Sequence, residues 1–269
     1  MNSASSMNVG SLLREWRERR SLSQLALACE ASISQRHLSF VESGRSTPSR
    51  DMIIHLAEQL SIPLRERNSL LVAAGFAPLY SQRPPEDPAL GPTSEAVAAI
   101  LKGHEPYPAI AVDRHWNLLQ ANAALPFMLT GVDPSLLEGP INVLRIALHP
   151  KGLMPRILNH AEWRRHLLHR LDREISNTAD PKLVELANEL KSYPHGENRA
   201  RFGVEMPNLG NVAVMLQLSS DFGPLSLIST TTVFGTALDI GLAELTIETF
   251  FPADPDTGAR LRQIGATQK

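Results

Sequence analysis

The chain has 269 residues, of which 43% are hydrophobic, and its formal net charge is −2 at pH 7. This length is about twice the commonest domain size, so two domains with separate cores are expected and extended disorder is not. The single cysteine, Cys29, excludes an intrachain disulfide. We expect a cytoplasmic protein, because nothing resembles a signal peptide and no apolar run approaches the roughly 20 residues that span a bilayer.

The charge is unevenly distributed along the chain. Residues 1–80 contain nine Arg and no Lys against seven acidic residues, whereas the remainder carries a net charge of −4. Arginine forms paired hydrogen bonds with phosphates and guanine edges more readily than lysine does. A genome rich in G and C would produce the same bias, so the charge pattern needs support from helix geometry.

Apolar spacing and capping residues predict five short helices, at residues 9–20, 24–31, 35–42, 49–60 and 64–75. Ser23 and Ser34 are good N-caps for the second and third helices. Gly44 is placed to end the third helix in the left-handed conformation. Because only a few residues separate the second helix from the third, the two are expected to form a helix-turn-helix.

The segment SQLALACEASISQRHLSFVESGRSTPS resembles the helix-turn-helix of Cro and lambda-type repressors, the xenobiotic-response-element family. The resemblance implies that Gln24 meets a phosphate, that Ala28 lets the two helices cross, and that Gln35 and Arg36 read bases. Ser32 departs from the family, which usually has Gly at this turn position. A non-glycine residue with positive φ costs on the order of 1 kcal/mol, which the fold can tolerate.

The chemistry of the third helix agrees with this resemblance. The first turn of a recognition helix points at base edges in the major groove, where Arg36 can bond guanine and Gln35 can bond adenine. His37 either touches the DNA backbone or merely covers the helix, and Phe40 either packs on a thymine methyl or belongs to the core. The residues predicted to bind DNA are Gln24, Ser34, Gln35, Arg36, His37, Ser43 and Arg45.

Domain boundaries follow from proline content. Five prolines between Ala77 and Pro92 predict an extended linker over residues 77–92. The linker would separate an all-α DNA-binding domain, residues 8–76, from a second domain at residues 93–265. The fold class is therefore multi-domain.

The second domain is expected to be α+β. It would begin with a helix at 94–107 and a hairpin whose strands, 109–112 and 116–120, flank a turn at Asp113 to His115, after which Asn122 begins a helix. Further helices are expected at 142–153, 159–175 and 180–193, strands at 201–207, 212–220, 224–235 and 244–254, and a last helix from Asp254 to near Ile264. This order predicts an antiparallel sheet with helices on one face.

The segments EPYPAIAVDRHWNLLQANAA, NVLRIALHPKGL and EWRRHLLHRL resemble the ligand-binding domain of MmyB-like regulators, a PAS-like fold attached to the same helix-turn-helix. The resemblance runs from about Glu105 to about Leu261. It implies a pocket between sheet and helices for apolar ligands such as fatty acids. From the residues alone, the many Leu, Ile and Met side chains would equally form a solid core.

Four residues are candidates for ligand binding. Arg145 lies among apolar residues, where a ligand carboxylate would offset its charge, and His149 lies four residues later on the same face. Alternatively, Arg145 reaches water or pairs with an acid such as Glu138. Trp163 and Met128 would form apolar walls of the pocket.

Catalysis and metal binding are not expected. No nucleophile elbow, phosphate loop, dinucleotide fingerprint or HExxH motif occurs. His160, His166, His169 and Asp172 share one helix with Arg164, Arg165, Arg170 and Arg173, which predicts a solvated basic face. No cofactor is indicated.

We therefore expect a one-component transcription regulator rather than an enzyme. Its partners would be double-stranded DNA, bound by a homodimer at an inverted-repeat operator, and a small, mostly apolar effector. The alternative is a DNA-binding repressor or antitoxin whose C-terminal domain binds a protein.

Overall fold

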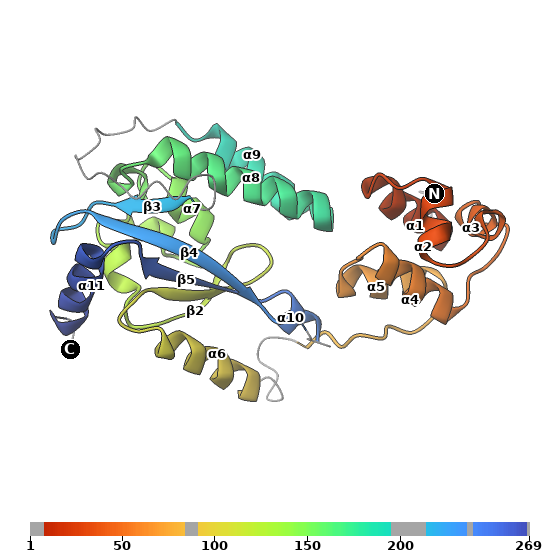
Figure 1. Ribbon diagram of the computed structural model, residues 1–269, viewed down its shortest axis with the longest axis horizontal. Coiled ribbons are helices and arrows are strands. Elements are labelled where there is room, and N and C mark those ends of the chain that lie inside the picture. The colour runs from red at the N-terminus through yellow and green to blue at the C-terminus, as the bar shows by residue number, and fades with distance from the viewer. Residues whose placement is uncertain (1–7, 84–90, 195–213, 236–238, 268–269) are drawn as a thin grey trace. The chain divides into compact units, whose positions relative to one another are not determined.

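The computed structural model describes residues 8–83, 91–194, 214–235 and 239–267, and these form two compact units (Figure 1). One unit is formed mainly by residues up to Arg83 and the other mainly by residues from 84 onward. The helices of the N-terminal unit are α1 (Val9–Arg19), α2 (Gln24–Glu30), α3 (Gln35–Glu42), α4 (Arg50–Gln59) and α5 (Leu64–Ala73). The five predicted helices are confirmed.

Short apolar faces and serine caps build this helical domain. Leu13, Leu27 and Leu38 are among the side chains that are almost completely buried in its core. Close packing of α1 on α3 depends on Gly10, because a Cβ atom there would lie 2.0 Å from the carbonyl oxygen of Val41. Any larger residue would push the two helices apart.

Three helices of this domain are followed by a serine in the left-handed conformation, where glycine is usual. The φ angles of Ser21, Ser32 and Ser61 are 56°, 53° and 48°. The conformation expected for Ser32 in the turn between α2 and α3 is therefore confirmed.

The C-terminal unit is an α+β domain. Its helices in the described ranges are α6 (Gly91–Gly103), α7 (Val143–Leu148), α8 (His160–Thr178), α9 (Pro181–Ser192), α10 (Ile240–Ala243) and α11 (Pro255–Thr267), together with the short 3₁₀ helices η2 (Pro126–Leu129), η3 (Pro134–Leu136) and η4 (Met154–Arg156). Its strands are β1 (Ala109–Val112), β2 (Leu118–Ala121), β3 (Met215–Leu218), β4 (Leu225–Val233) and β5 (Thr246–Pro252). Within the described residues they form one antiparallel sheet in the order β2-β1-β5-β4-β3.

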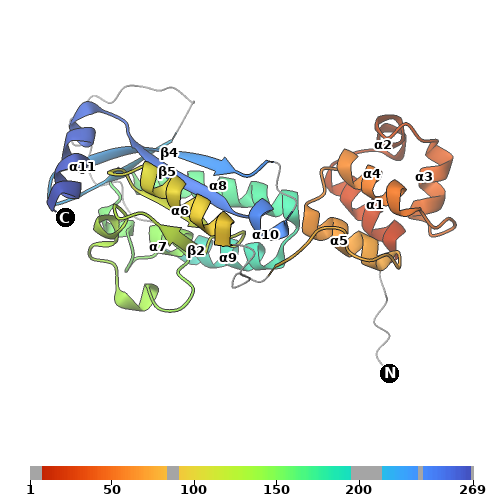
Figure 2. The same ribbon diagram turned by 90° about the horizontal axis from the view of Figure 1, so that it is seen from below.

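Helices cover both faces of this sheet, so the expectation of helices on one face is wrong. Figures 1 and 2 show α6 on one face and α8 on the other. The small side chains Ala109 and Ala111 pack with Ile247 beneath α6, while Ile110 and Val112 point into the main core. Burial of all four residues of β1 accounts for the second layer, because an uncovered face would carry polar residues.

Other expectations need correction in detail. Helix α6 begins at Gly91, inside the predicted linker, and Pro92 is tolerated there because a first-turn residue needs no amide hydrogen. Trp116 lies in the hairpin turn with φ of 66°, not in the strand. The strand expected at 201–207 falls outside the described residues.

Asn122 does not begin an α-helix. Its buried side chain accepts a hydrogen bond from the Ala109 amide at 3.1 Å and donates to the carbonyl oxygens of Tyr107, at 2.7 Å, and Leu101, at 3.1 Å. The side chain thus fixes the connection between α6 and β1. A turn and η2 follow it.

Candidate functional site

The first turn of α3 exposes the two residues predicted to read bases. The Ser34 hydroxyl accepts a hydrogen bond from the His37 amide at 3.1 Å and caps the helix. Leu38 and Val41 are fully buried on the inner side of α3, which leaves Gln35 and Arg36 exposed to solvent and His37 half-buried. Helical periodicity thus points the first turn outward.

The end of α3 positions the next arginine. Gly44 adopts a φ of 73°, and the Arg45 amide bonds the Phe40 carbonyl oxygen at 2.8 Å, which closes the helix as predicted. The guanidinium carbons of Arg36 and Arg45 lie 5.4 and 5.9 Å from the centre of the Phe40 ring. Phe40 thus supports two exposed cations, while the Ser43 hydroxyl donates to its carbonyl oxygen at 3.3 Å.

A buried ion pair holds Gln24 at the start of α2. The Gln24 Nε2 donates to Glu42 Oε2 at 2.8 Å, and Glu42 accepts two further hydrogen bonds from Arg17, at 2.6 and 2.9 Å. The Glu42 and Arg17 side chains are only 2% and 9% exposed. An amide nitrogen carries two hydrogens, so the second hydrogen of Gln24 Nε2 is not used by Glu42.

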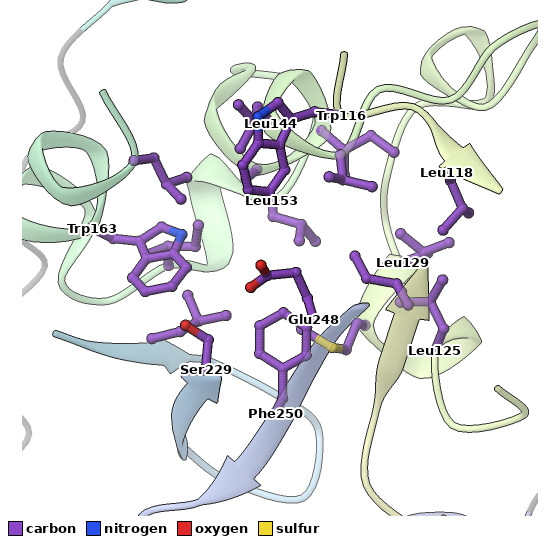
Figure 3. A pocket seen from close by; sticks show the side chains of 18 of the residues that line it. Trp116, Leu118, Leu125, Leu129, Leu144, Leu153, Trp163, Ser229, Glu248 and Phe250 are labelled. Carbon is purple, nitrogen blue, oxygen red and sulfur yellow. The ribbon is translucent and has the colours of Figure 1, made fainter. Parts of the chain in front are cut away.

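The C-terminal domain contains an apolar cavity in which the centre of a water-sized sphere can occupy about 90 Å³. Figure 3 shows its walls, which include Trp116, Leu144, Trp163 and Phe250. The cavity lies between the core face of the sheet and the helices above it. The region is therefore not a completely filled core.

Two of the four predicted ligand residues line this cavity and two do not. Met128 and Trp163 are in its walls. Arg145 lies elsewhere and bonds both carboxylate oxygens of Glu189, at 2.6 and 2.7 Å. His149 Nδ1 instead accepts a hydrogen bond from the Lys151 amide at 3.0 Å. Among the described residues, the structure brings neither Arg145 nor His149 to the cavity wall.

The charged residues that do line the cavity are Arg170 and Glu248. Arg170 Nη2 donates to Glu248 Oε1 at 2.5 Å, and the Thr231 hydroxyl donates to the same oxygen at 2.9 Å. Glu248 lies on β5, the central strand of the sheet, and is only 4% exposed although it is an acidic residue. Its carboxylate points into the cavity near Ser229 (Figure 3).

A second acid lies beside Arg170. The guanidinium carbon of Arg170 lies 4.4 Å from the centre of the Trp116 ring, and Trp116 Nε1 donates to Glu174 Oε2 at 2.7 Å. Glu174 Oε1 is 3.6 Å from Arg170 Nε. Burial raises the pKa of Glu174, whereas burial, followed by the charge of Arg170, lowers the pKa of His166.

The expectation of a solvated basic face is wrong for Arg170, which lines the cavity, and for His160, which is 1% exposed. Arg170 follows Trp163 by seven residues, which places both on the same side of α8, and this spacing was the signal in the sequence. Arg165 and His169 are exposed, as a solvated face requires. Within the described ranges, no group of three or more His, Cys, Asp or Glu residues is arranged to hold a metal ion.

The helices in the described part of the chain are too short or too polar to cross a membrane.

Comparison with known proteins identifies both domains. Residues 93–264 match the ligand-binding domain of MmyB-like transcription regulators, and residues 13–67 match a helix-turn-helix family. Curated proteins gave no significant match. Among solved structures, an RNA-binding light-oxygen-voltage receptor is 11% identical with a TM-score of 0.26; the alignment covers 97% of this chain and 63% of that protein, so the chain spans less than two thirds of its length.

A helix-turn-helix and a cavity-containing α+β domain on one chain define a DNA-binding transcription regulator with a ligand-binding domain. Because one family match spans more than half of the sequence, the chain belongs to the MmyB-like transcription regulators. The expected architecture, an all-α domain followed by an α+β PAS-like domain, is thus confirmed.

Proposed function

We propose that the protein is a one-component regulator in which α3 reads an operator and the cavity of the C-terminal domain holds a small apolar effector. The observation that carries this proposal is the cavity, whose walls are mostly Leu, Ile, Val and aromatic side chains. An apolar ligand that fills such a space removes its own surface and that of the walls from water. Met128 and Trp163 are proposed as contacts of the ligand.

On the DNA side, Gln35 and Arg36 are the proposed base-reading residues, and Gln24, Ser43 and Arg45 are proposed phosphate contacts. One short recognition helix covers only a few base pairs, so a homodimer would bind two half-sites of an inverted repeat. The effector would change DNA affinity only to the extent that it binds the DNA-competent state more or less tightly than the other state.

The cavity is tested by extracting the purified full-length protein with organic solvent and analysing the extract by mass spectrometry. A stoichiometric apolar small molecule supports the proposal. A stoichiometric polypeptide in the preparation, with no small molecule, would favour a regulator whose C-terminal domain binds a protein partner.

The DNA surface is tested by binding selection with two variants. Arg36→Ala should cost about 1 to 3 kcal/mol on the specific site and relax the base preference at one position. Arg45→Ala should weaken binding to all sequences more evenly and reduce its salt dependence. An unchanged base preference for Arg36→Ala would remove Arg36 from the base contacts, and a single unpaired half-site in footprinting would contradict the dimer.

A further inference from the structure

One carboxylate oxygen that lines the cavity, Glu248 Oε2, has no hydrogen-bond donor among the described residues. Both hydrogen bonds to the Glu248 side chain, from Arg170 and from Thr231, go to Oε1. Among the described residues, none donates to Oε2. Figure 3 shows the carboxylate pointing into the space between Trp163 and Phe250. A carboxylate oxygen in such apolar surroundings is costly unless it accepts a hydrogen bond.

Strand pairing explains why this acid faces the ligand space. Glu248 pairs with Ile110 of β1 on one side and with Thr231 of β4 on the other. Ile110 points into the main core, and side chains of directly paired residues lie on the same face of a sheet. Glu248 therefore stands on the inner face of the central strand, a position that a hydrophobic residue would otherwise fill.

The charges around this end of the cavity disfavour an anion. Arg170 has two acids close by, Glu248 at 2.5 Å and Glu174 at 3.6 Å, so one guanidinium faces two carboxyl groups. His166, on the same helix, adds little positive charge at neutral pH because burial lowers its pKa. A ligand carboxylate would have to displace Glu248 from Arg170 and would then lie beside it, where like charges repel.

An uncharged hydrogen-bond donor on the ligand would not be repelled by the Glu248 carboxylate. Ser229 also lines the cavity, and its hydroxyl has no hydrogen-bond partner among the described residues. A ligand hydroxyl can donate to Glu248 Oε2 and accept from Ser229, which would satisfy both groups. A hydrogen bond with one ionised partner is about twice as strong as a neutral one.

We propose that Glu248 selects the effector by its head group, so that the cavity accepts an apolar body ending in an uncharged hydrogen-bond donor, such as an alcohol, and disfavours a fatty-acid carboxylate. This inference rests on the proposed function, namely that the cavity binds a small apolar molecule. It names the part of that molecule that Glu248 and Ser229 recognise.

The test uses isothermal titration calorimetry at pH 7.5 to compare three probes that share an unbranched ten-carbon chain. The full-length protein is first freed of co-purified ligand on a hydrophobic resin and is then titrated with decan-1-ol, decanoate and methyl decanoate. Decan-1-ol should bind at least tenfold more tightly than decanoate. It should also bind at least threefold more tightly than the ester, which can accept but not donate.

Ionised decanoate also leaves water less readily than the alcohol. The diagnostic quantity is therefore the ratio of the affinity for decan-1-ol to the affinity for decanoate, compared between the wild type and Glu248→Gln. The ratio should fall at least fivefold, because the variant frees Arg170 and removes the like charge. Glu189→Gln is the matched control, since Glu189 also pairs with an arginine but lies outside the cavity wall. Its ratio should stay within twofold of that of the wild type.

The possible failures can be told apart. Binding of none of the three probes would overturn both the proposed function and this inference. Binding of all three with equal affinity, tighter binding of decanoate, or a ratio that Glu248→Gln leaves unchanged would overturn the inference while keeping an apolar effector. If Glu248→Gln does not fold, Ser229→Ala provides a second variant: it should weaken decan-1-ol at least threefold, and an unchanged affinity would contradict the proposed head-group site.

Discussion

Replacing Glu42 by alanine is expected to lower the free energy of unfolding of the helical domain by about 3 to 5 kcal/mol. The magnitude follows from burial. The Arg17 side chain is 9% exposed and forms two hydrogen bonds with Glu42, so the variant leaves a cation with little water and with only the more distant Glu18, at 3.7 Å, as an acid beside it. The same variant also removes the acceptor of the Gln24 amide.

The double variant is expected to be much more stable than the single variant. Replacing both partners, as in Arg17→Met with Glu42→Leu, removes the buried charges together and should cost far less than the single change. Glu15→Ala is the matched control. Glu15 pairs with Arg19 at 3.1 Å on the surface, where the pair is worth about 0.5 kcal/mol or less.

Native-state hydrogen exchange is the suitable assay, because it measures the opening of each domain separately within the full-length protein. Peptides that cover Val9–Arg19 and Gln35–Glu42 report on α1 and α3. Loss of less than about 1 kcal/mol in Glu42→Ala would refute the assignment of a large desolvation cost to this pair. A double variant as unstable as the single one would show that the pair acts through shape and not through charge.

Three further changes test other features. Ser32→Gly should stabilise the helical domain by about 0.5 to 1 kcal/mol in the same exchange assay, because glycine adopts positive φ without strain, and a destabilised variant would contradict this account. Gly10→Ala should destabilise the domain by about 1 to 3 kcal/mol, since the new methyl group would meet the Val41 carbonyl oxygen, and unchanged exchange would show that α1 can shift freely. Burial and the neighbouring Glu189 raise the pKa of Tyr193 to about 12. Ultraviolet titration should therefore show a tyrosine that ionises late, and this signal should be absent in Tyr193→Phe. The stability that the protonated Tyr193 contributes should be lost as the pH rises from 10 to 12.

The helix-turn-helix was predictable because its determinants are local. The Ser34 cap and the left-handed Gly44 act within a few residues of the chain, and the apolar residues of α3 repeat at helical spacing. The positive φ of Ser32 followed in the same way from its place in the turn. Even so, the resemblance did not reveal that Gln24 is held by Glu42, a partner 18 residues away.

The polar end of the cavity could not be predicted because it depends on contacts between distant segments. The alternation of side chains along β5 shows that Glu248 and Ile247 lie on opposite faces of the sheet, but it does not show which face lines the cavity. That depends on the strand order, which places β5 at the centre of the sheet. The pairing of Arg145 with an acid was one of the two alternatives, but the acid itself could not be identified for a similar reason, since Glu189 lies 44 residues further along the chain.

The contact of Phe40 with two arginines affects how much side-chain entropy would be lost in the proposed binding of DNA. A free arginine side chain samples many rotamers, and fixing it costs up to about 2 kcal/mol of entropy. Arg36 and Arg45 already lie against the same ring before any DNA arrives. Part of their rotational freedom is therefore lost when α3 folds. In the proposed complex with DNA, the entropic penalty of association would then be smaller than for two freely moving cations, and a smaller side chain at position 40 would increase it.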